Sequence, residues 1–533
     1  MKKSLFGISL LTITALYCLL SAVIILITIL TGSPVIYGII ISTIIIIVQF
    51  LVSPFITDIV MKLFYKAKFD NEIPEYLKNF INQVCQENNM KYPRIGYIDD
   101  GSPNAFTYGH TKNDARIVIT RGILELLNEE EVKAVVGHEL GHAVHYDMLF
   151  MTVAELVPLL LYGIYEICFS DNDNNNNNNK YGQIIGIVAY ILYLLSNYII
   201  LWLSRTREYN ADYFSVDVTK NPNALAQALV KVGYGLTTTE DSNKKHSVSK
   251  SNALGIFDSK TSKSLVVCSY ENDGSINKES IKNAMKWEMW NVWAKWYQLN
   301  STHPLISKRL LAISERSKEF NQEPYITFDL QKEESYVDDF LVEVLINILP
   351  FLSLFIALIL SIVLSICFKL NSFILWGISI IIVLFCFDVR LKRKYKNKDY
   401  KETNVKELLG EVKVSEITSI PCTIEGEIIG RGNPGCIFNE DFVIKDETGI
   451  IFLDYRQPLK LQDTIFALFK APEYFNKKAK ITGWYRRSPV PYIEINTIEV
   501  DGKKKRLCSY PLMIGFEIFF FFIGIALIIA GIF

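Results

Sequence analysis

The fold is decided by the stretch Val135-Val-Gly-His-Glu-Leu-Gly-His-Ala-Val-His-Tyr-Asp147. The residues just before it are typical of a helix start. Asn128 can cap a helix N-terminus, and the acidic run 129–131 falls in the first turn, where the helix dipole favours negative charge. Apolar residues then recur at helical spacing. We therefore expect one helix to run from residue 129 through this stretch.

That helix contains an HExxH arrangement formed by His138, Glu139 and His142. Because the two histidines are one helical turn apart, both rings project from one face and can bind one Zn²⁺, with Glu139 beside the water that the metal would activate. The alternative is a buried helix that happens to carry two histidines. A catalytic zinc needs a third protein ligand, so the pentapeptide alone does not decide between these readings.

The apolar residues gather in long uncharged runs. Half of the 533 residues are hydrophobic, and the net charge is −1 at pH 7. This charge balance gives no reason to expect nucleic acid as a partner. The runs have the roughly 20 residues needed to cross a lipid bilayer. The nine cysteines include no CxxC pair, which argues against a disulfide framework and against a cysteine zinc site.

We predict about seven spans, most of them paired as hairpins. In chain order they cover residues 5–30, 35–56, 148–169, 184–203, 344–368, 373–387 and 511–533. Lysine and arginine recur at the same side of each hairpin. By the positive-inside rule, the segments between the hairpins are therefore cytoplasmic.

Residues 70–147 are typical of a soluble α/β segment, with a helix over 73–88 and strands at 94–98 and 116–120. Between the strands lies Ser102-Pro-Asn-Ala-Phe-Thr-Tyr-Gly109, in which polar residues alternate with aromatic ones. This pattern predicts an edge strand, which in a protease can hold an extended peptide by strand addition. An ordinary hairpin is the alternative, and the spacing does not separate the two.

A candidate third metal ligand follows the second hairpin. The stretch Ser204-Arg-Thr-Arg-Glu-Tyr-Asn-Ala-Asp212 continues a helix and places Glu208 and Asp212 one turn apart on one face. Glu208 can complete a His₂Glu zinc set, and Asp212 can accept a hydrogen bond from the far nitrogen of a ligand histidine. The alternative is a solvated acidic face paired with Arg205 or Arg207.

Four motifs follow one another in a recognisable order. They are Asn104-Ala-Phe106, the HExxH motif with Asp147 behind it, the stretch 204–212, and Ser301-Thr-His-Pro-Leu-Ile-Ser-Lys-Arg309. In this order the chain resembles the HtpX-like membrane zinc metalloproteases, over about residues 1–315. Two spans before the HExxH motif and two after it match the HtpX-like layout, whereas the related CAAX prenyl endopeptidases place more spans ahead of the motif.

The resemblance implies an integral-membrane zinc endopeptidase with one Zn²⁺ per chain. The residue roles that it implies are metal binding by His138, His142 and Glu208, acid/base catalysis by Glu139, and assistance near the active site by His303 and Arg309. Asp212 is expected to orient a ligand histidine, and Asn104, Ala105 and Phe106 are expected to bind substrate. The expected substrates are proteins or peptides, above all membrane proteins cleaved at the cytoplasmic face in protein quality control. Two alternatives remain open: a non-proteolytic membrane scaffold that recruits partners through its C-terminal domain, and a prenyl-protein processing protease.

Two further features lie outside the motifs. Four tryptophans repeat every three residues, at 287, 290, 293 and 296. This stripe predicts core packing, with a lipid-interface belt or a wall of the substrate cleft as alternatives. Between residues 403 and 507, where the family resemblance has ended, five short strand-like runs predict a small β-barrel, with an OB-like topology as the first guess. We expect this region to be a docking module for a substrate or partner.

The predicted fold class is therefore a multi-span α-helical membrane protein with a mainly α (α+β) zincin-type catalytic domain and a C-terminal OB-like β-barrel. The predicted domains are an N-terminal transmembrane hairpin (1–60), a zinc metalloprotease domain (61–340) interrupted by a hairpin (148–204), a third hairpin (341–388), a cytoplasmic β-barrel (389–510) and a last transmembrane helix (511–533). The expected location is the cell membrane, or an internal membrane in a eukaryote, with the catalytic and barrel domains in the cytoplasm.

Overall fold

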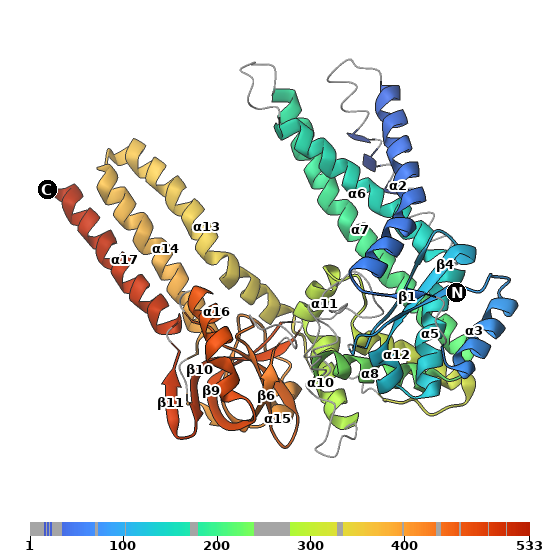
Figure 1. The fold of residues 1–533 in the computed structure, drawn as a ribbon. Coiled ribbons are helices and arrows are strands. Elements are labelled where there is room, and N and C mark those ends of the chain that lie inside the picture. The colour runs from blue at the N-terminus through green and yellow to red at the C-terminus, as the bar shows by residue number, and fades with distance from the viewer. Residues whose placement is uncertain are drawn as a thin grey trace. The chain divides into compact units, whose positions relative to one another are not determined.

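The computed structural model describes residues 15–16, 19–20, 22–23, 35–69, 73–101, 103–170, 180–238, 278–327, 334–396, 399–432, 439–457, 460–488, 490–507 and 509–533. The chain divides into two compact units (Figure 1). The first comprises Met1–Ser262 and Gln298–Thr327, and the second comprises Lys263–Tyr297 and Phe328–Phe533. Residues 171–179 are rich in asparagine, and their composition predicts a disordered loop; they lie outside the described residues. The same holds for most of the polar, lysine-rich insert at 236–280, which by sequence is a loop or a cover over the cleft.

A four-stranded sheet in the first unit positions the segment ahead of the HExxH helix. Its strands are β1 (Lys68–Phe69), β2 (Arg94–Ile98), β4 (Ala115–Thr120) and β3 (Ala105–Gly109), in that order across the sheet. β2 and β4 are parallel, and β3 pairs with β4 in the antiparallel sense. The predicted edge strand is confirmed, because β3 is the last strand of the sheet. Phe106 and Tyr108 of β3 pack with Met61, near the end of α2 (Val35–Leu63).

The HExxH motif lies on α5 (Glu129–Val144), which begins at the predicted cap. The Asn128 side chain accepts a hydrogen bond from the backbone N–H of Glu131, and the Glu131 carboxylate accepts one from the backbone N–H of Asn128. This reciprocal capping box satisfies two backbone donors that a helix start otherwise leaves without partners. A cap of this kind stabilises a helix by about 1 kcal/mol.

The partner of α5 is α7 (Lys180–Thr219), a continuous helix of 40 residues. At 1.5 Å per residue it is about 60 Å long, which is twice the thickness of the hydrocarbon core of a bilayer. One helix can therefore cross the membrane and still extend beyond it. Glu208 and Asp212 lie on the extension, one turn apart, as predicted.

Gly141 allows α5 and α7 to approach closely. A Cβ atom added at Gly141 would lie 3.1 Å from the Cα of Ala211 and 3.2 Å from the Cβ of Phe214. Only glycine leaves room for backbone at this distance. The Ser215 hydroxyl adds a hydrogen bond of 2.6 Å to the carbonyl of Ala134. The helix that carries Glu208 is thus held directly against the helix that carries the histidines.

Five of the described helices are long and apolar enough to cross a membrane. They are α6 (Asp147–Ser170), α7, α13 (Val337–Phe368), α14 (Ser372–Lys394) and α17 (Ser509–Ile532). They correspond to the last five predicted spans, and α2 covers the second. Most of the first predicted span lies outside the described residues, although Leu16, Leu20 and Val23 pack with α6 and α7.

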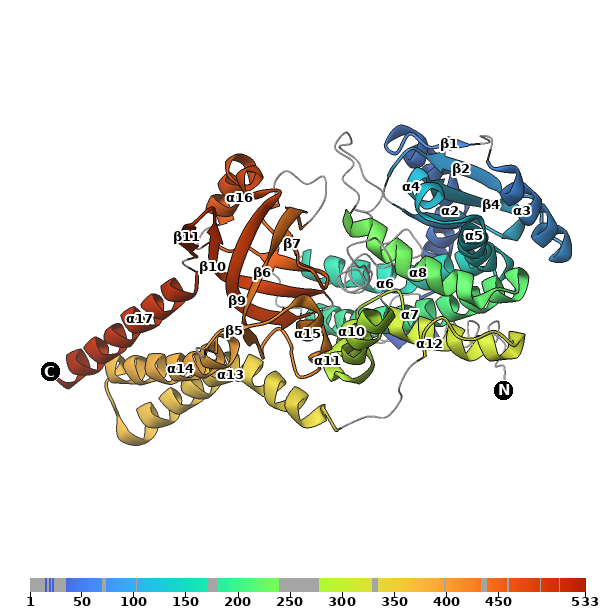
Figure 2. The same ribbon diagram turned by 90° about the horizontal axis from the view of Figure 1, so that it is seen from below.

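The second unit contains a closed β-barrel of five strands, seen in Figure 2. The strands are β6 (Ile420–Arg431), β7 (Phe442–Lys445), β8 (Ile450–Asp454), β9 (Lys477–Arg487) and β10 (Pro491–Val500). β6 pairs with β7, β7 with β8, β8 with β10, β10 with β9, and β9 again with β6. The β8–β10 pair is parallel and the others are antiparallel. All five strand-like runs seen in the sequence are strands of this barrel.

The tryptophan stripe does not act as one surface. It lies on α10 (Lys278–Trp290) and α11 (Val292–Leu299). Trp287 is buried, and its Nε1 donates to the carbonyl of Val414 at 2.7 Å. Trp293 donates to the carboxylate of Glu343, whereas Trp296 is 48% exposed. Core packing is therefore confirmed for Trp287, within the unit that contains the barrel.

Candidate metal centre and active site

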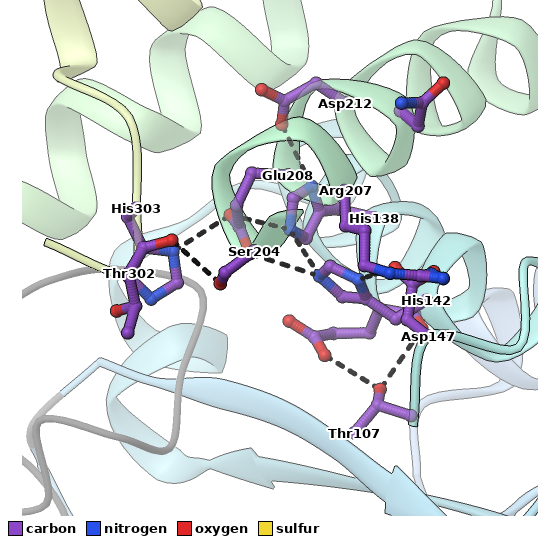
Figure 3. Close-up of polar contacts among 12 residues, drawn as sticks. Thr107, His138, His142, Asp147, Ser204, Arg207, Glu208, Asp212, Thr302 and His303 are labelled. Carbon is purple, nitrogen blue, oxygen red and sulfur yellow. Dashed lines mark hydrogen bonds and ion pairs between the residues drawn. The ribbon is translucent and has the colours of Figure 1, made fainter. Parts of the chain in front are cut away.

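The contact between α5 and α7 brings His138, His142 and Glu208 together (Figure 3). The Nε2 atoms of the two histidines are 3.1 Å apart, and Nε2 of His142 lies 3.5 Å from Oε1 of Glu208. Nε2 of His138 lies 3.7 Å from Oε2 of Glu208. In a tetrahedral site with ligands at about 2.0–2.1 Å, neighbouring ligand atoms are roughly 3.3 Å apart. The three side chains therefore fit a zinc ion in both chemistry and spacing.

The far nitrogen of His138 is held by a carboxylate. Its Nδ1 lies 2.9 Å from Oδ1 of Asp212. Arg309, on α12 (Ile306–Ser317), in turn donates to both oxygens of Asp212 at 2.8 and 2.6 Å. A proton kept at Nδ1 leaves the lone pair of Nε2 free to bind a metal. Arg309 reaches the site mainly through Asp212, although its Nη1 lies 3.5 Å from Oε2 of Glu208.

His142 has an equivalent support in Asp147, for which the sequence analysis gave no role. Nδ1 of His142 lies 2.6 Å from Oδ2 of Asp147, and Arg207 donates to the other oxygen of that carboxylate. Burial alone would lower the pKa of His142. The hydrogen bond and charge of Asp147, together with the charges of Glu208 and Glu139, outweigh burial and raise the pKa to about 9. The general rule that a ligand histidine donates its far N–H to a carboxylate could have identified Asp147.

Glu139 is buried beside the donor set, and it contacts β3 through Thr107. The Thr107 hydroxyl donates to Oε2 of Glu139 at 2.7 Å and also lies 3.1 Å from the Glu139 carbonyl oxygen (Figure 3). Thr107 was not among the predicted site residues. The sequence feature that could have identified Thr107 is the alternation of side chains along a strand, which turns Thr107 away from the face that carries Phe106 and Tyr108.

The three residues predicted to bind substrate lie at the start of β3, and their side chains are buried. Asn104 is fixed by Thr120, whose hydroxyl accepts from the Asn104 backbone N–H at 2.8 Å. Ala105 and Phe106 are 0% and 3% exposed, and Phe106 belongs to the apolar cluster around Met61. A peptide at this edge would meet the main chain of these residues instead of their side chains.

His303 comes from a loop far along the chain and points at Glu208. Its Nδ1 lies 3.0 Å from Oε2 of Glu208. The loop is tied to α7, since the Ser204 hydroxyl donates to the carbonyl of Thr302 at 2.9 Å and Arg205 donates to the carbonyl of Ser301 at 2.8 Å. These bonds place His303 at the rim of the donor set (Figure 3).

Two histidines near the motif stay outside the site. The ring of His145 packs edge-on against Phe214, with centroids 5.6 Å apart, so His145 is a packing residue. His110 pairs with Asp114 at 2.6 Å, at the far end of β3.

The described part of the chain has five helices able to cross a bilayer and a His₂Glu donor group beside a buried glutamate, which are features of an integral-membrane metalloprotease. The profile of peptidase family M48 matches residues 72–317. The chain belongs to this family, and within it to the HtpX-like metalloproteases. The match ends before α13, so it does not include the barrel.

Two relatives named "Protease HtpX homolog" support this assignment. The protein from Methanothermobacter thermautotrophicus is 38% identical over 202 residues, which cover 38% of this chain and 74% of the relative. The protein from Picrophilus torridus is 34% identical over 221 residues, covering 40% and 70%. The crystal structure of S. mikatae Ste24p aligns with 55% of this chain and 62% of its own, at 16% identity and a TM-score of 0.33, which is too low to compare the folds.

Proposed function

We propose that the protein is a zinc endopeptidase that cleaves membrane or membrane-associated proteins at the cytoplasmic face, with a role in protein quality control. In this proposal His138, His142 and Glu208 bind the zinc ion. The observation that carries it is the convergence of three donor atoms from two helices, with the carboxylate of Glu139 next to them. A structural helix has no need for such a group, whereas a hydrolytic metal site does.

The residues around the donor set have separate tasks in this mechanism. A bound zinc ion would supply Lewis-acid chemistry and lower the pKa of a water molecule. Glu139 takes the proton of the attacking water and delivers it to the departing amine, while Thr107 holds its carboxylate in place. His303 donates a hydrogen bond to the oxygen of the substrate carbonyl as negative charge develops there. Arg309 is a positioning residue that acts through Asp212.

The edge strand β3 supports the expected substrate class. A peptide added to a strand edge is held by main-chain hydrogen bonds, which depend little on its sequence. Such binding suits a protease that acts on many unfolded chains. Lys62 near the end of α2, Arg205 on α7 and the basic end of α14 support the cytoplasmic placement of both units by the positive-inside rule.

The strand pairing of the barrel supports an OB-like identity. An OB-fold is a five-stranded Greek-key barrel. Here the closing order is β6-β7-β8-β10-β9, and α16 (Lys460–Phe469) lies between β8 and β9. The proposal includes the domain boundaries expected from the sequence. It also includes a docking role for residues 403–507.

Replacing the general base tests the function. Glu139→Gln keeps the shape of the side chain but removes its basicity. In the full-length protein purified in nanodiscs, we expect an unchanged zinc content and a loss of cleavage of an unfolded substrate of about 10²–10⁴-fold. Full activity in this variant would overturn the mechanism. A wild-type protein that binds zinc stoichiometrically yet cleaves no unfolded substrate would instead favour the scaffold alternative.

A further inference from the structure

The short helix α16 (Lys460–Phe469) has two apolar faces. Among the described residues, one of these faces packs against the barrel of the second unit. The inner face carries Phe466, which is buried and stacks on Tyr455 with ring centroids 3.9 Å apart. This stack closes one side of the barrel core, next to Phe442. The helix is therefore firmly attached to the barrel.

The outer face of α16 is apolar and exposed. Leu461 is 70% exposed, Ile465 49%, Leu468 36% and Phe469 73%. Their spacing of four, three and one residues places them along one side of a helix. A soluble domain gains nothing from such a stripe, because it leaves apolar surface in water at a cost of roughly 25 cal/mol per Å². Within the part of the chain that the structure describes, these side chains remain largely uncovered.

The position of α16 indicates what covers the stripe. Lys505 of β11 (Lys503–Arg506) has its Nζ 4.8 Å from the ring centroid of Phe466, and Figures 1 and 2 both show α16 beside β11. Ser509, where the membrane helix α17 begins, comes four positions after Lys505. Four residues span at most ~14 Å of extended chain. The barrel-facing side of α16 therefore contacts a residue that lies close along the chain to the point at which this unit enters the bilayer.

The ends of the membrane helices mark the same boundary. Tyr510 of α17 stacks on Tyr395, which follows α14, with centroids 4.5 Å apart, and it also contacts Trp484 of β9. Tyrosine and tryptophan gather at the headgroup level, where one side of the ring is apolar and the other is wet. The part of β9 around Trp484 therefore packs against the ends of the membrane helices α14 and α17.

The charges around α16 fit the same surface. Lys460 and Lys470 flank the outer stripe, and Lys503, Lys504 and Arg506 on β11 are exposed nearby. An exposed apolar stripe bordered by lysines is the pattern of a helix that lies in the interface of a bilayer with anionic lipids. At ten residues, or about 15 Å, the helix is too short to cross.

We propose that α16 is an interfacial membrane anchor, whose outer face of Leu461, Ile465, Leu468 and Phe469 inserts among the lipid headgroups of the bilayer that α13, α14 and α17 cross. The anchor fixes the orientation of the barrel on the membrane surface.

Lipid crosslinking in the intact protein tests the anchor. The full chain, in nanodiscs of phosphatidylcholine with a minority of phosphatidylserine, would carry the photoreactive residue benzoylphenylalanine in place of Phe469. The matched control carries it in place of Asp501, which is exposed in the turn between β10 and β11. Mass spectrometry of the irradiated protein should find lipid adducts at position 469 in about tenfold excess over position 501.

A second variant separates lipid insertion from mere proximity. Leu461→Ser together with Ile465→Ser removes apolar area from the stripe but leaves the buried face intact, so the thermal unfolding of the protein should not change. With the probe at position 469, we expect lipid adducts to fall by about tenfold. The proposal is overturned if the probe reacts mainly with protein, which would indicate a second copy or a protein partner. It is equally overturned if no adduct forms, or if the two serines leave the lipid adduct unchanged.

Discussion

Arg309 in the first unit and Arg487 in the second are both fully buried, yet they serve different ends. Arg309 binds the carboxylate of Asp212, which holds His138, whose Nε2 faces two other donor atoms. Arg487 donates to the main-chain carbonyls of Ala284 and Leu409, and its guanidinium lies 4.7 Å from the ring centroid of Trp287.

The partners of the two arginines show which buried charge belongs to a candidate functional site. The Arg487 network ends in main-chain oxygens and an aromatic face. The Arg309 network ends in imidazole and carboxylate atoms that converge on one point. Among the described residues, His138, His142 and Glu208 are the one group of three side chains that could hold a metal ion. Convergence of donors, more than burial of charge, therefore distinguishes the two units.

The second unit also reaches back along the chain. Trp287, which contacts Arg487 and Val414, lies on α10, and Trp287 comes sixteen residues before His303. The described residues 278–297 belong to the barrel unit, while Gln298–Thr327 belongs to the catalytic unit. The barrel is therefore joined to the protease by an interleaved chain and is not simply appended at the end.

The largest expected effect on zinc binding and cleavage comes from removing the third donor. Glu208→Ala takes away the only carboxylate of the proposed metal set, so we expect zinc content to fall well below stoichiometric and cleavage to disappear with it. The control is Asp217→Asn on the same helix, whose carboxylate pairs with Arg316 away from the site. Metal analysis of both purified variants decides the matter. An unchanged zinc content in Glu208→Ala would assign the third ligand elsewhere.

Replacing each of the two buried arginines by leucine tests whether they have different roles. Each loses charged hydrogen bonds, worth roughly 1.5–3 kcal/mol apiece, so both Arg309→Leu and Arg487→Leu should unfold at lower temperature. Only Arg309→Leu should also weaken zinc binding, by about 10–100-fold, because it releases Asp212 from behind His138. Competition with a metal chelator measures the affinity. Equal affinities in the two variants would show that Arg309 has no positioning role.

The smallest expected effect comes from the contact between α5 and α7. In Gly141→Ala, the new Cβ would lie 3.1 Å from the Cα of Ala211, which requires a shift of a few tenths of an ångström between the helices. We expect about a tenfold loss of activity, since catalytic groups tolerate little misplacement. The matched control is Gly163→Ala on α6, where a Cβ meets nothing within 4 Å. Full activity in Gly141→Ala would mean that the helices separate without cost to the site.

Much of the site was visible in the sequence, because its central parts obey local rules. The i, i+4 spacing of His138 and His142 and of Glu208 and Asp212 fixes which side chains share a helix face, whatever the helices pack against. The cap at Asn128 and the strands of the barrel likewise follow from short patterns. Thr107 was missed, because its partner Glu139 lies on another element and only the folded chain brings the two within reach. The role of Asp147 was missed although His142 is only five residues away, because the turn between α5 and α6 decides whether the carboxylate faces the ring.

By itself, the sequence determined the helices that can cross a bilayer, the two donor faces and the strand-like runs, because periodicity and capping depend on near neighbours along the chain. Only the tertiary structure decided that Arg309 acts through Asp212, that Trp287 belongs to the barrel unit, and that α16 turns a second apolar face outward. Those facts depend on which surfaces meet when distant segments pack, and a linear pattern of residue types does not encode that contact.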